Sequence, residues 1–397
     1  MATVINFGCR LNNVEGKKIE EYLIHDDSKI IINSCAVTNE TERQVKQTIR
    51  KLHKQHPEKE IIVTGCAVQI SPDVYASLNE VNGVIDNINK LKPETWVPSS
   101  NSIDFETNIF DKPMDLRPVL QQDSLKVRES LVIQQGCNHR CTFCIIPFGR
   151  GNNRSFEPSS LINEVKRMID HGVKEIVLTG VDISDYGSDF QNHYCMSSLI
   201  QDLLAQTSIP RIRLSSIDCV EIDEHFDEVF QDPRVMPHLH LSIQSGDDMI
   251  LKRMKRRHNS NDIYKFIDHC RSIRPEVTFG ADIIAGFPTE TDVMFNNTFN
   301  LLTNNLISHL HVFPFSPKKD TPASRMPQVN KSIIKTRSKK LRELGEVLLK
   351  KAISNLKSPR KILIEQLHNG FVMGYDQNYI KKQIPMIGMP IGEIITA

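Results

Sequence analysis

Short apolar runs rich in β-branched residues alternate with amphipathic stretches over residues 1–95. The apolar runs predict strands at residues 2–7, 29–33 and 60–64. Polar and apolar residues recur with a helical period near residues 12–23 and 40–53, which predicts a helix after each of the first two strands. Strands that alternate with helices favour a parallel sheet, so we expect an α/β N-terminal domain of the Rossmann or flavodoxin type.

The same alternation resumes in residues 127–350. Strands are predicted at residues 130–134, 175–178, 211–214, 238–243, 277–284 and 309–313. Amphipathic stretches such as 159–171 and 261–273 predict the helices that connect them. Six parallel strands joined by helices indicate a partial (β/α)6 barrel of the TIM type, whose active site forms at the C-terminal ends of the strands.

Two further segments complete the predicted organisation. Residues 96–126 hold the only tryptophan, Trp96, together with several prolines and polar runs, which is typical of a linker. Residues 356–397 contain short strands separated by turns and predict a small all-β domain. A chain of 397 residues that is 39% hydrophobic is long enough to bury the cores of such domains.

Two groups of three cysteines follow predicted strands. The first group is Cys137, Cys141 and Cys144 in the run GCNHRCTFC, and the second is Cys9, Cys35 and Cys66. The carboxyl ends of parallel strands meet at one edge of a sheet, so the second group should gather at one place. Three thiolates leave one iron of a four-iron cluster open to a ligand that is not protein. The sequence therefore predicts two 4Fe-4S clusters, each with an open position.

The cysteines are also consistent with simpler roles than cluster ligands. Cys9, Cys35 and Cys66 are also consistent with three buried structural cysteines. The CxxxCxxC loop is also consistent with a zinc knuckle, with His139 as the fourth ligand. Repeated placement just after a strand favours a cluster over the first alternative, and a tight loop with a free face favours a cofactor over the second. The ungrouped Cys195, Cys219 and Cys270 are predicted to be packing residues.

Composition limits the location and the partners of the protein. Free thiols grouped in this way are typical of a reducing compartment. The sequence shows neither the pattern of a signal peptide nor an apolar run long enough for a membrane helix. We therefore expect a cytoplasmic protein without a membrane partner. Net charge is +1, but residues 331–361 hold eleven Lys or Arg against two Glu, and residues 252–257 hold five basic residues in six. Such blocks commonly bind phosphates, although a solvated helix face is the simpler alternative.

The first cysteine group resembles the signature loop of radical S-adenosylmethionine enzymes, including an aromatic residue, Phe143, before the last cysteine. That resemblance implies that Cys137, Cys141 and Cys144 hold a 4Fe-4S cluster whose fourth iron binds S-adenosyl-L-methionine. An electron passed to the cofactor would then generate a 5′-deoxyadenosyl radical. Later segments are similar to the strand ends that bind the cofactor in that superfamily. The residues implied by this similarity are Phe143, Thr179, Gly180, Ser215, Gln244, Asp282 and Gly286.

The second cysteine group resembles the methylthiotransferase family. FGCRLN, NSCAVTNETERQ and VTGCAVQ appear in that order, and the contexts of Cys35 and Cys66 are most similar to the branch that acts on N6-threonylcarbamoyladenosine in tRNA. The resemblance implies that the Cys9, Cys35 and Cys66 cluster delivers sulfur and that a methylthio group is inserted at C2 of the adenosine. It also implies an anticodon stem-loop as substrate, an electron donor of the flavodoxin or ferredoxin type, and no role for DNA.

The C-terminal segment is similar to the small RNA-binding TRAM barrel of that family. Within it, Tyr375 and Tyr379 either stack on bases or lie in the domain core, and core packing is favoured. Other substrates within the family are isopentenyladenosine in tRNA and an aspartate of a ribosomal protein. A different class of protein, a non-catalytic RNA-binding protein stabilised by zinc, is also consistent with clustered cysteines.

Overall fold

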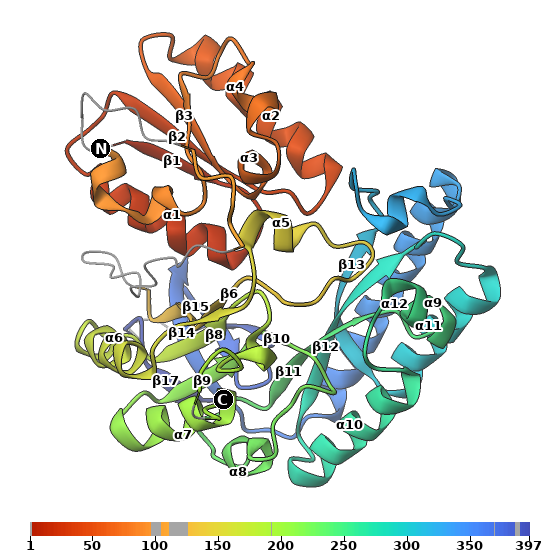
Figure 1. Ribbon diagram of the computed structural model, residues 1–397. Helices are drawn as coiled ribbons and strands as arrows, with labels where there is room; N and C mark the ends of the chain where they lie inside the picture. The colour runs from red at the N-terminus through yellow and green to blue at the C-terminus, as the bar shows by residue number, and fades with distance from the viewer. Residues whose placement is uncertain (1, 97–104, 111–125, 192, 369, 386–389) are drawn as a thin grey trace.

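A computed structural model describes residues 2–96, 105–110, 126–191, 193–368, 370–385 and 390–397. Figure 1 shows the N-terminal domain at one end of a barrel and the C-terminal strands β14 and β15 beside barrel strands β8 and β9. In the described part of the chain, no helix has the length and apolar character needed to cross a membrane.

The N-terminal domain is a parallel sheet whose strands lie in chain order. Its strands are β1 (Thr3–Asn6), β2 (Lys29–Ser34), β3 (Glu60–Gly65) and β4 (Gly83–Val84). Its helices are α1 (Arg10–Tyr22), α2 (Asn39–Gln55), α3 (Cys66–Ile70), α4 (Pro72–Ala76) and the 3₁₀ turns η1 (Asn89–Leu91) and η2 (Pro93–Trp96). The parallel sheet predicted from the alternating pattern is confirmed.

Apolar residues cover both faces of this sheet. Ile30 and Ile32 pack against α2 residues that include Val45 and Ile49. Ile31 faces the opposite side and packs with Ile19 of α1 and with Trp96. Neighbouring residues of β2 are thus buried on opposite faces, as expected for a strand in a parallel sheet that is covered on both sides.

The central part is a half-open barrel of parallel strands. They are β5 (Arg128–Val132), β8 (Glu175–Thr179), β9 (Arg211–Leu214), β10 (Ser216–Ile217), β11 (His238–Gln244), β12 (Thr278–Ala285) and β13 (Ile307–Pro314). Only Ser215 separates β9 from β10, so the two continue one strand and the barrel has the six strands predicted. A two-stranded antiparallel ribbon, β6 (Gln134–Gln135) with β7 (Arg154–Ser155), follows the first barrel strand.

Helices surround the barrel and connect its strands. They are α5 (Ile146–Arg150), α6 (Pro158–Asp170), η3 (Ile183–Asp185), α7 (Met196–Gln206), α8 (Phe226–Phe230), α9 (Asp248–Met254), α10 (Ser260–Ile273), α11 (Asp292–Asn304), η4 (Pro322–Arg325) and α12 (Lys331–Asn355). The barrel core is continuous with the N-terminal domain, because Leu11 and Val14 of α1 belong to the same buried cluster as the barrel strands. The N-terminal domain is therefore packed against the barrel end by apolar contact.

The C-terminal part is an antiparallel sheet in the order β16-β15-β14-β17. Its strands are β14 (Lys361–His368), β15 (Phe371–Asp376), β16 (Lys381–Pro385) and β17 (Ile394–Thr396). The turn after β15 inserts into the barrel: Asn378 donates to the carbonyls of Pro237 and Glu276 at 3.0 and 2.8 Å. Those carbonyls precede β11 and β12, so the turn closes the end of the barrel opposite to the N-terminal domain.

The basic stretches predicted to bind phosphate have different environments. Most lysines of α12 are exposed, consistent with either a solvated face or a phosphate contact, but Arg337 is buried and pairs with Glu290 at 2.7 Å. In the block 252–257, Arg256 points inward and pairs with Asp218 at 2.7 Å, and Arg257 pairs with Glu221. In this second block, carboxylates therefore already pair with two of the arginines, which leaves fewer of its charges available to a phosphate.

Candidate active site

A cavity of about 650 Å³ lies between the N-terminal domain and the barrel. Cysteines from both groups line it, namely Cys9, Cys35, Cys137, Cys141 and Cys144. The sixth cysteine, Cys66, is not in this lining; it lies behind it, close to Gly149 of α5 and near enough to Cys35 to raise the pKa of that thiol. Five of the six grouped cysteines therefore line one cavity, although about seventy residues separate the two groups in the sequence.

The CxxxCxxC loop is anchored at both ends by backbone hydrogen bonds. Cys137 donates its N–H to Gly151 at 3.0 Å, and Thr142 donates to Met254 at 3.0 Å. Gly136 has a φ of +73°, and a Cβ there would lie 1.8 Å from the carbonyl oxygen of Asn152, so glycine is required at the start of the loop. The anchoring presents three thiols on one short segment.

Hydrogen-bond donors reach the sulfurs of this loop. The backbone N–H of His139 lies 3.4 Å from Cys137 Sγ, and an Nη1 of Arg256 lies 3.6 Å from Cys141 Sγ. Burial raises the pKa of the Cys137 and Cys144 thiols to about 12. Thiols with a raised pKa hold their protons more tightly, so binding of a metal cluster to Cys137 and Cys144 has to release those protons.

The N-terminal cysteines each begin a connection after a parallel strand. Cys9 precedes α1, Cys35 follows β2, and Cys66 is the first residue of α3. Gly8 has a φ of +92°, and a Cβ at this position would lie 2.4 Å from Cys35 Sγ. The close approach of these two segments therefore depends on glycine. Burial raises the pKa of Cys35 to about 12, and the nearby Cys66 and Cys9 add to this increase.

Arg150 links the barrel to the N-terminal cysteines. It is the last residue of α5, only 2% exposed, and its Nε donates to Cys66 Sγ at 3.2 Å. Its Nη atoms donate to Glu15, to Asn12 at 2.5 Å and to Gln135 at 3.2 Å. A guanidinium presents five donors in a rigid fork, so one side chain can hold α1, α3 and the barrel together.

Glu15 supplies the negative charge that this buried network needs. It is 1% exposed and pairs with Arg150 and with the Lys90 ammonium at 2.7 Å. Burial by itself raises the pKa of Glu15, but the charges of Arg150 and Lys90 outweigh burial and hold it at about 2. One carboxylate between two cations leaves a net positive charge beside Cys66, which favours anionic thiolate ligands there.

The spacing of the sulfurs tests whether a cluster or a zinc ion fits. Zinc–sulfur bonds of about 2.3 Å in a tetrahedron would place three thiolates within about 4 Å of one another. Among the residues that the structure describes, neither cysteine group has all three sulfurs within 4.8 Å of one another. His139, the candidate fourth zinc ligand, directs its Nε2 to Asp182 at 2.9 Å and Glu221 at 3.1 Å. Neither cysteine trio is therefore spaced for a single zinc ion, although Cys137, His139 and Asp182 have ligand atoms within 4.8 Å of one another.

Most residues predicted to contact the cofactor line this cavity. Those that do are Phe143, Thr179, Gly180, Ser215, Gln244 and Asp282. Phe143 also packs edge-to-face on Phe287, with ring centroids 6.4 Å apart. Gly286 lies outside the lining: its close neighbour is Ile334 of α12, 2.4 Å from where a Cβ would stand. The backbone approach at Gly286 is therefore to a helix of the barrel.

Gln244 and Asp282 have features that sequence patterns did not indicate. Gln244 has a φ of +70° and ends β11 at a register shift, a conformation that clusters at functional sites. Asp282 accepts hydrogen bonds from His240 at 3.0 Å and His311 at 3.2 Å. Burial raises the pKa of Asp282, but the hydrogen bonds and charges of the two histidines outweigh burial and hold it well below its usual range. The alternating histidines in HLHLSIQ and HLHVFP could have indicated that imidazoles from neighbouring strands lie beside Asp282.

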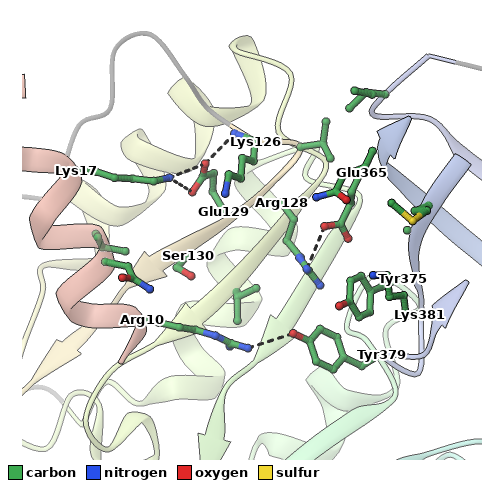
Figure 2. Close-up of a pocket in the computed structure, with 18 residues that line it drawn as sticks. Arg10, Lys17, Lys126, Arg128, Glu129, Ser130, Glu365, Tyr375, Tyr379 and Lys381 are labelled. Carbon is green, nitrogen blue, oxygen red and sulfur yellow. Dashed lines mark hydrogen bonds and ion pairs between the residues drawn. The ribbon is translucent and has the colours of Figure 1, made fainter. Parts of the chain in front are cut away.

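A second cavity, of about 610 Å³, adjoins the first at the junction of all three parts. Figure 2 shows Lys17 and Arg10 reaching into it from α1, Arg128 and Glu129 from the first barrel strand, and Tyr375 and Tyr379 from the C-terminal part. Its lining carries five basic side chains against two carboxylates. Arg10 and Tyr379 line both cavities and so form the boundary between them.

Comparison with protein families gives two matches. Residues 131–302 match the radical SAM superfamily, and residues 1–86 match a family described as uncharacterized protein family UPF0004. Three curated relatives carry the name threonylcarbamoyladenosine tRNA methylthiotransferase MtaB. The one from Rickettsia prowazekii is 45% identical over 86% of this chain and 82% of its own. Those from Thermotoga maritima and Bacillus subtilis are 34% and 32% identical, over 98% and 100% of this chain and 91% and 93% of theirs.

Solved structures with the same fold include two radical S-adenosylmethionine enzymes. The methyltransferase TsrM from Kitasatospora setae aligns with a TM-score of 0.59 and 13% identity, over 77% of this chain and 68% of its own. The cobalamin-dependent enzyme OxsB aligns with a TM-score of 0.52 and 12% identity, over 87% of this chain and 56% of its own. At this identity the likeness concerns the fold alone.

Proposed function

Because the chain belongs to the family of radical S-adenosylmethionine tRNA methylthiotransferases, we propose that it inserts a methylthio group at C2 of N6-threonylcarbamoyladenosine in the anticodon loop of tRNA. Membership of this enzyme family also makes the alternative of a non-catalytic zinc protein wrong. The name shared by the three relatives supports this substrate over isopentenyladenosine and over a ribosomal-protein aspartate.

The observation that carries the proposal is that cysteines of both groups line one cavity, with Cys66 beside Cys35 just behind the lining. Cys137, Cys141 and Cys144 would hold the 4Fe-4S cluster that binds S-adenosyl-L-methionine. Cys9, Cys35 and Cys66 would hold a second 4Fe-4S cluster. When bound, the clusters and S-adenosyl-L-methionine supply the one-electron and sulfur chemistry that replacement of an unactivated aromatic C–H bond requires.

Residues of the chain would position these groups and the substrate. Asp282, with His240 and His311, and the strand-end groups Thr179 and Ser215 would contact the cofactor and the base from the barrel side. A base in a single-stranded loop can be unstacked and inserted between the two parts at modest cost. Phosphates on either side of it would bind basic surfaces that position the RNA without reading its sequence. A flavodoxin or ferredoxin would supply the electron.

Mass spectrometry of tRNA nucleosides tests the substrate and the reaction together. We expect a strain without this protein to lose 2-methylthio-N6-threonylcarbamoyladenosine and to accumulate the nucleoside that lacks the methylthio group. Restoring the wild-type gene should restore the product. A deletion strain that retains all of its methylthiolated threonylcarbamoyladenosine contradicts the proposal.

Variants of the two cysteine groups separate their roles. Replacing Cys9, Cys35 and Cys66 together by alanine should leave cleavage of S-adenosyl-L-methionine intact and abolish the methylthiolated product. Replacing Cys137, Cys141 and Cys144 should abolish both. A Cys270→Ala variant is the control, since Cys270 is buried in the barrel core, away from the cavity lining. Retention of product in the first triple variant would contradict a sulfur-delivering role.

A further inference from the structure

Arg10 differs in charge balance from the other basic residues of the active cavity. Arg213 pairs with Glu175 at 2.7 Å, and Arg256 pairs with Asp218 at 2.7 Å. Within the described part of the chain, Arg10 has no carboxylate partner; its one side-chain hydrogen bond is to the Tyr379 hydroxyl, at 3.3 Å. Its guanidinium therefore has donors to offer to an anion that enters the cavity.

The histidines of the cavity do not provide an equivalent cation. His240 and His311 are bonded to Asp282, and His139 is bonded to Asp182 and Glu221. Burial lowers the pKa of His238 far below its ordinary value and that of His309 to about 4, so both are neutral near pH 7. Arg10 is thus the cation of the described lining whose charge is not already matched.

The position of Arg10 relates it to one part of the proposed substrate. It follows Cys9 directly in the sequence, and both residues line the first cavity, so the guanidinium and the cluster that would deliver sulfur to C2 share one space. In adenine, C2 and the carbon that carries N6 are both bonded to the ring nitrogen N1. A substituent on N6 therefore lies on the same edge of the base as C2. When C2 faces the second cluster, that substituent enters the cavity that Arg10 lines.

Tyr379 holds the guanidinium in this place. Figure 2 shows Arg10 extending from α1 toward Tyr379, which lies beside Tyr375 of the C-terminal part. Tyr379 has a φ of +63° and stacks on His238, with ring centroids 5.6 Å apart. The strained turn is fixed because Asp376 accepts the N–H groups of Asn378 and Ile380 at 3.0 and 2.9 Å. The C-terminal part therefore contributes a residue to the wall of the active cavity.

We propose that Arg10, positioned by Tyr379, binds the carboxylate of the threonylcarbamoyl group and so selects this nucleoside over adenosines with an uncharged N6 substituent. The inference rests on the proposed function, whose substrate it makes specific. A guanidinium binds a carboxylate through two parallel hydrogen bonds, whereas a phosphate of the RNA backbone would use the same donors. The two anions differ in one respect: every RNA has the phosphates, and only the modified RNA has the carboxylate.

Binding of two stem-loop RNAs tests the proposal. One RNA carries N6-threonylcarbamoyladenosine and the other carries unmodified adenosine at the same position. Affinity is measured by fluorescence anisotropy on the anaerobically reconstituted enzyme without reductant, so turnover does not contribute. We expect Arg10→Gln to weaken binding of the modified RNA about 10- to 100-fold and to leave the unmodified RNA unchanged. Arg10→Lys should restore part of the loss, because an ammonium keeps the charge without the fork.

Two further variants complete the design. Tyr379→Phe should give a smaller loss with the same selectivity, since it keeps the Arg10 charge and removes only its anchor. Lys17→Gln is the matched control: it removes one positive charge from the same helix, but Lys17 faces Glu129 and the second cavity. It should affect both RNAs alike. Iron content and Trp96 fluorescence equal to those of the wild type show that each variant is folded and loaded.

The possible outcomes separate the role of Arg10 from the identity of the substrate. Equal weakening of both RNAs by Arg10→Gln would mean that Arg10 binds a phosphate, and this overturns the inference. Unchanged binding of both RNAs overturns it as well. If the wild-type enzyme itself does not distinguish the two RNAs, the proposed substrate fails together with the inference. If the wild type distinguishes them and Arg10→Gln distinguishes them equally well, the inference alone fails.

Discussion

Replacing Arg150 by methionine should unfold the N-terminal part of the protein at lower denaturant concentration. Methionine fills a similar volume but leaves Glu15 buried with only Lys90 as its partner. Burial raises the pKa of Glu15, but the two cations outweigh burial, and the net fall from 4.5 to about 2 corresponds to about 3 kcal/mol of stability. Removing one member of a buried ion pair typically costs about 3–5 kcal/mol, so we expect a loss of about 3 kcal/mol.

The single tryptophan provides the assay. Trp96 is 4% exposed and donates to the carbonyl of Lys90 at 2.9 Å, so its fluorescence reports on the neighbourhood of the network. Urea unfolding of metal-free Arg150→Met is compared with the wild type under reducing conditions. The double variant Glu15→Gln/Arg150→Met removes both charges and should lose less stability than the sum of the two single variants. A loss under about 1 kcal/mol for Arg150→Met, or strict additivity, refutes the reasoning.

Three other results are expected. The folded pKa of Glu15, about 2, lies below the unfolded value of 4.5, so the stability that this carboxylate contributes is complete above about pH 4.5 and is lost as the pH falls toward 2. The difference in unfolding free energy between wild type and Glu15→Gln should therefore close over that pH range. A difference that does not depend on pH contradicts the assignment. Gly8→Ala should lose about four irons per chain, since its Cβ would meet Cys35 Sγ. The control Gly172→Ala has a similar φ of +88° but open space around it, and it should keep its iron. Equal iron contents in the two variants contradict this expectation. Asn378→Ala removes two hydrogen bonds between the C-terminal turn and the barrel and should lower the free energy of unfolding by about 1–3 kcal/mol. The loss should appear as a lower melting temperature and faster proteolysis after α12. An unchanged melting temperature contradicts this expectation.

Local patterns predicted the features that depend on neighbouring residues in the sequence. Alternating apolar runs gave the strands of both parallel sheets, and strand-end placement brought Cys9, Cys35 and Cys66 to one region. The barrel strands put Thr179, Ser215 and Asp282 into the same cavity for the same reason. Parallel strands align their carboxyl ends, so strand boundaries alone locate such residues.

Contacts between distant segments could not be predicted in this way. Arg150 lies 135 residues from Glu15, and Tyr379 lies 369 residues from Arg10. Neither pair leaves a periodic signal, because the relative placement of the three parts sets both contacts. The basic block 252–257 shows the same limit: its composition indicated a phosphate-binding surface, whereas packing of α9 turns Arg256 inward to Asp218 and Cys141.

The most direct test of the account is anomalous diffraction at the iron edge from crystals of the anaerobically reconstituted enzyme. Two iron clusters are expected, one at Cys137, Cys141 and Cys144 and one at Cys9, Cys35 and Cys66, both facing the same cavity and each with one iron without a protein ligand. A single cluster, a zinc signal at either cysteine group, or a side chain such as His139 bound to the fourth iron would contradict it.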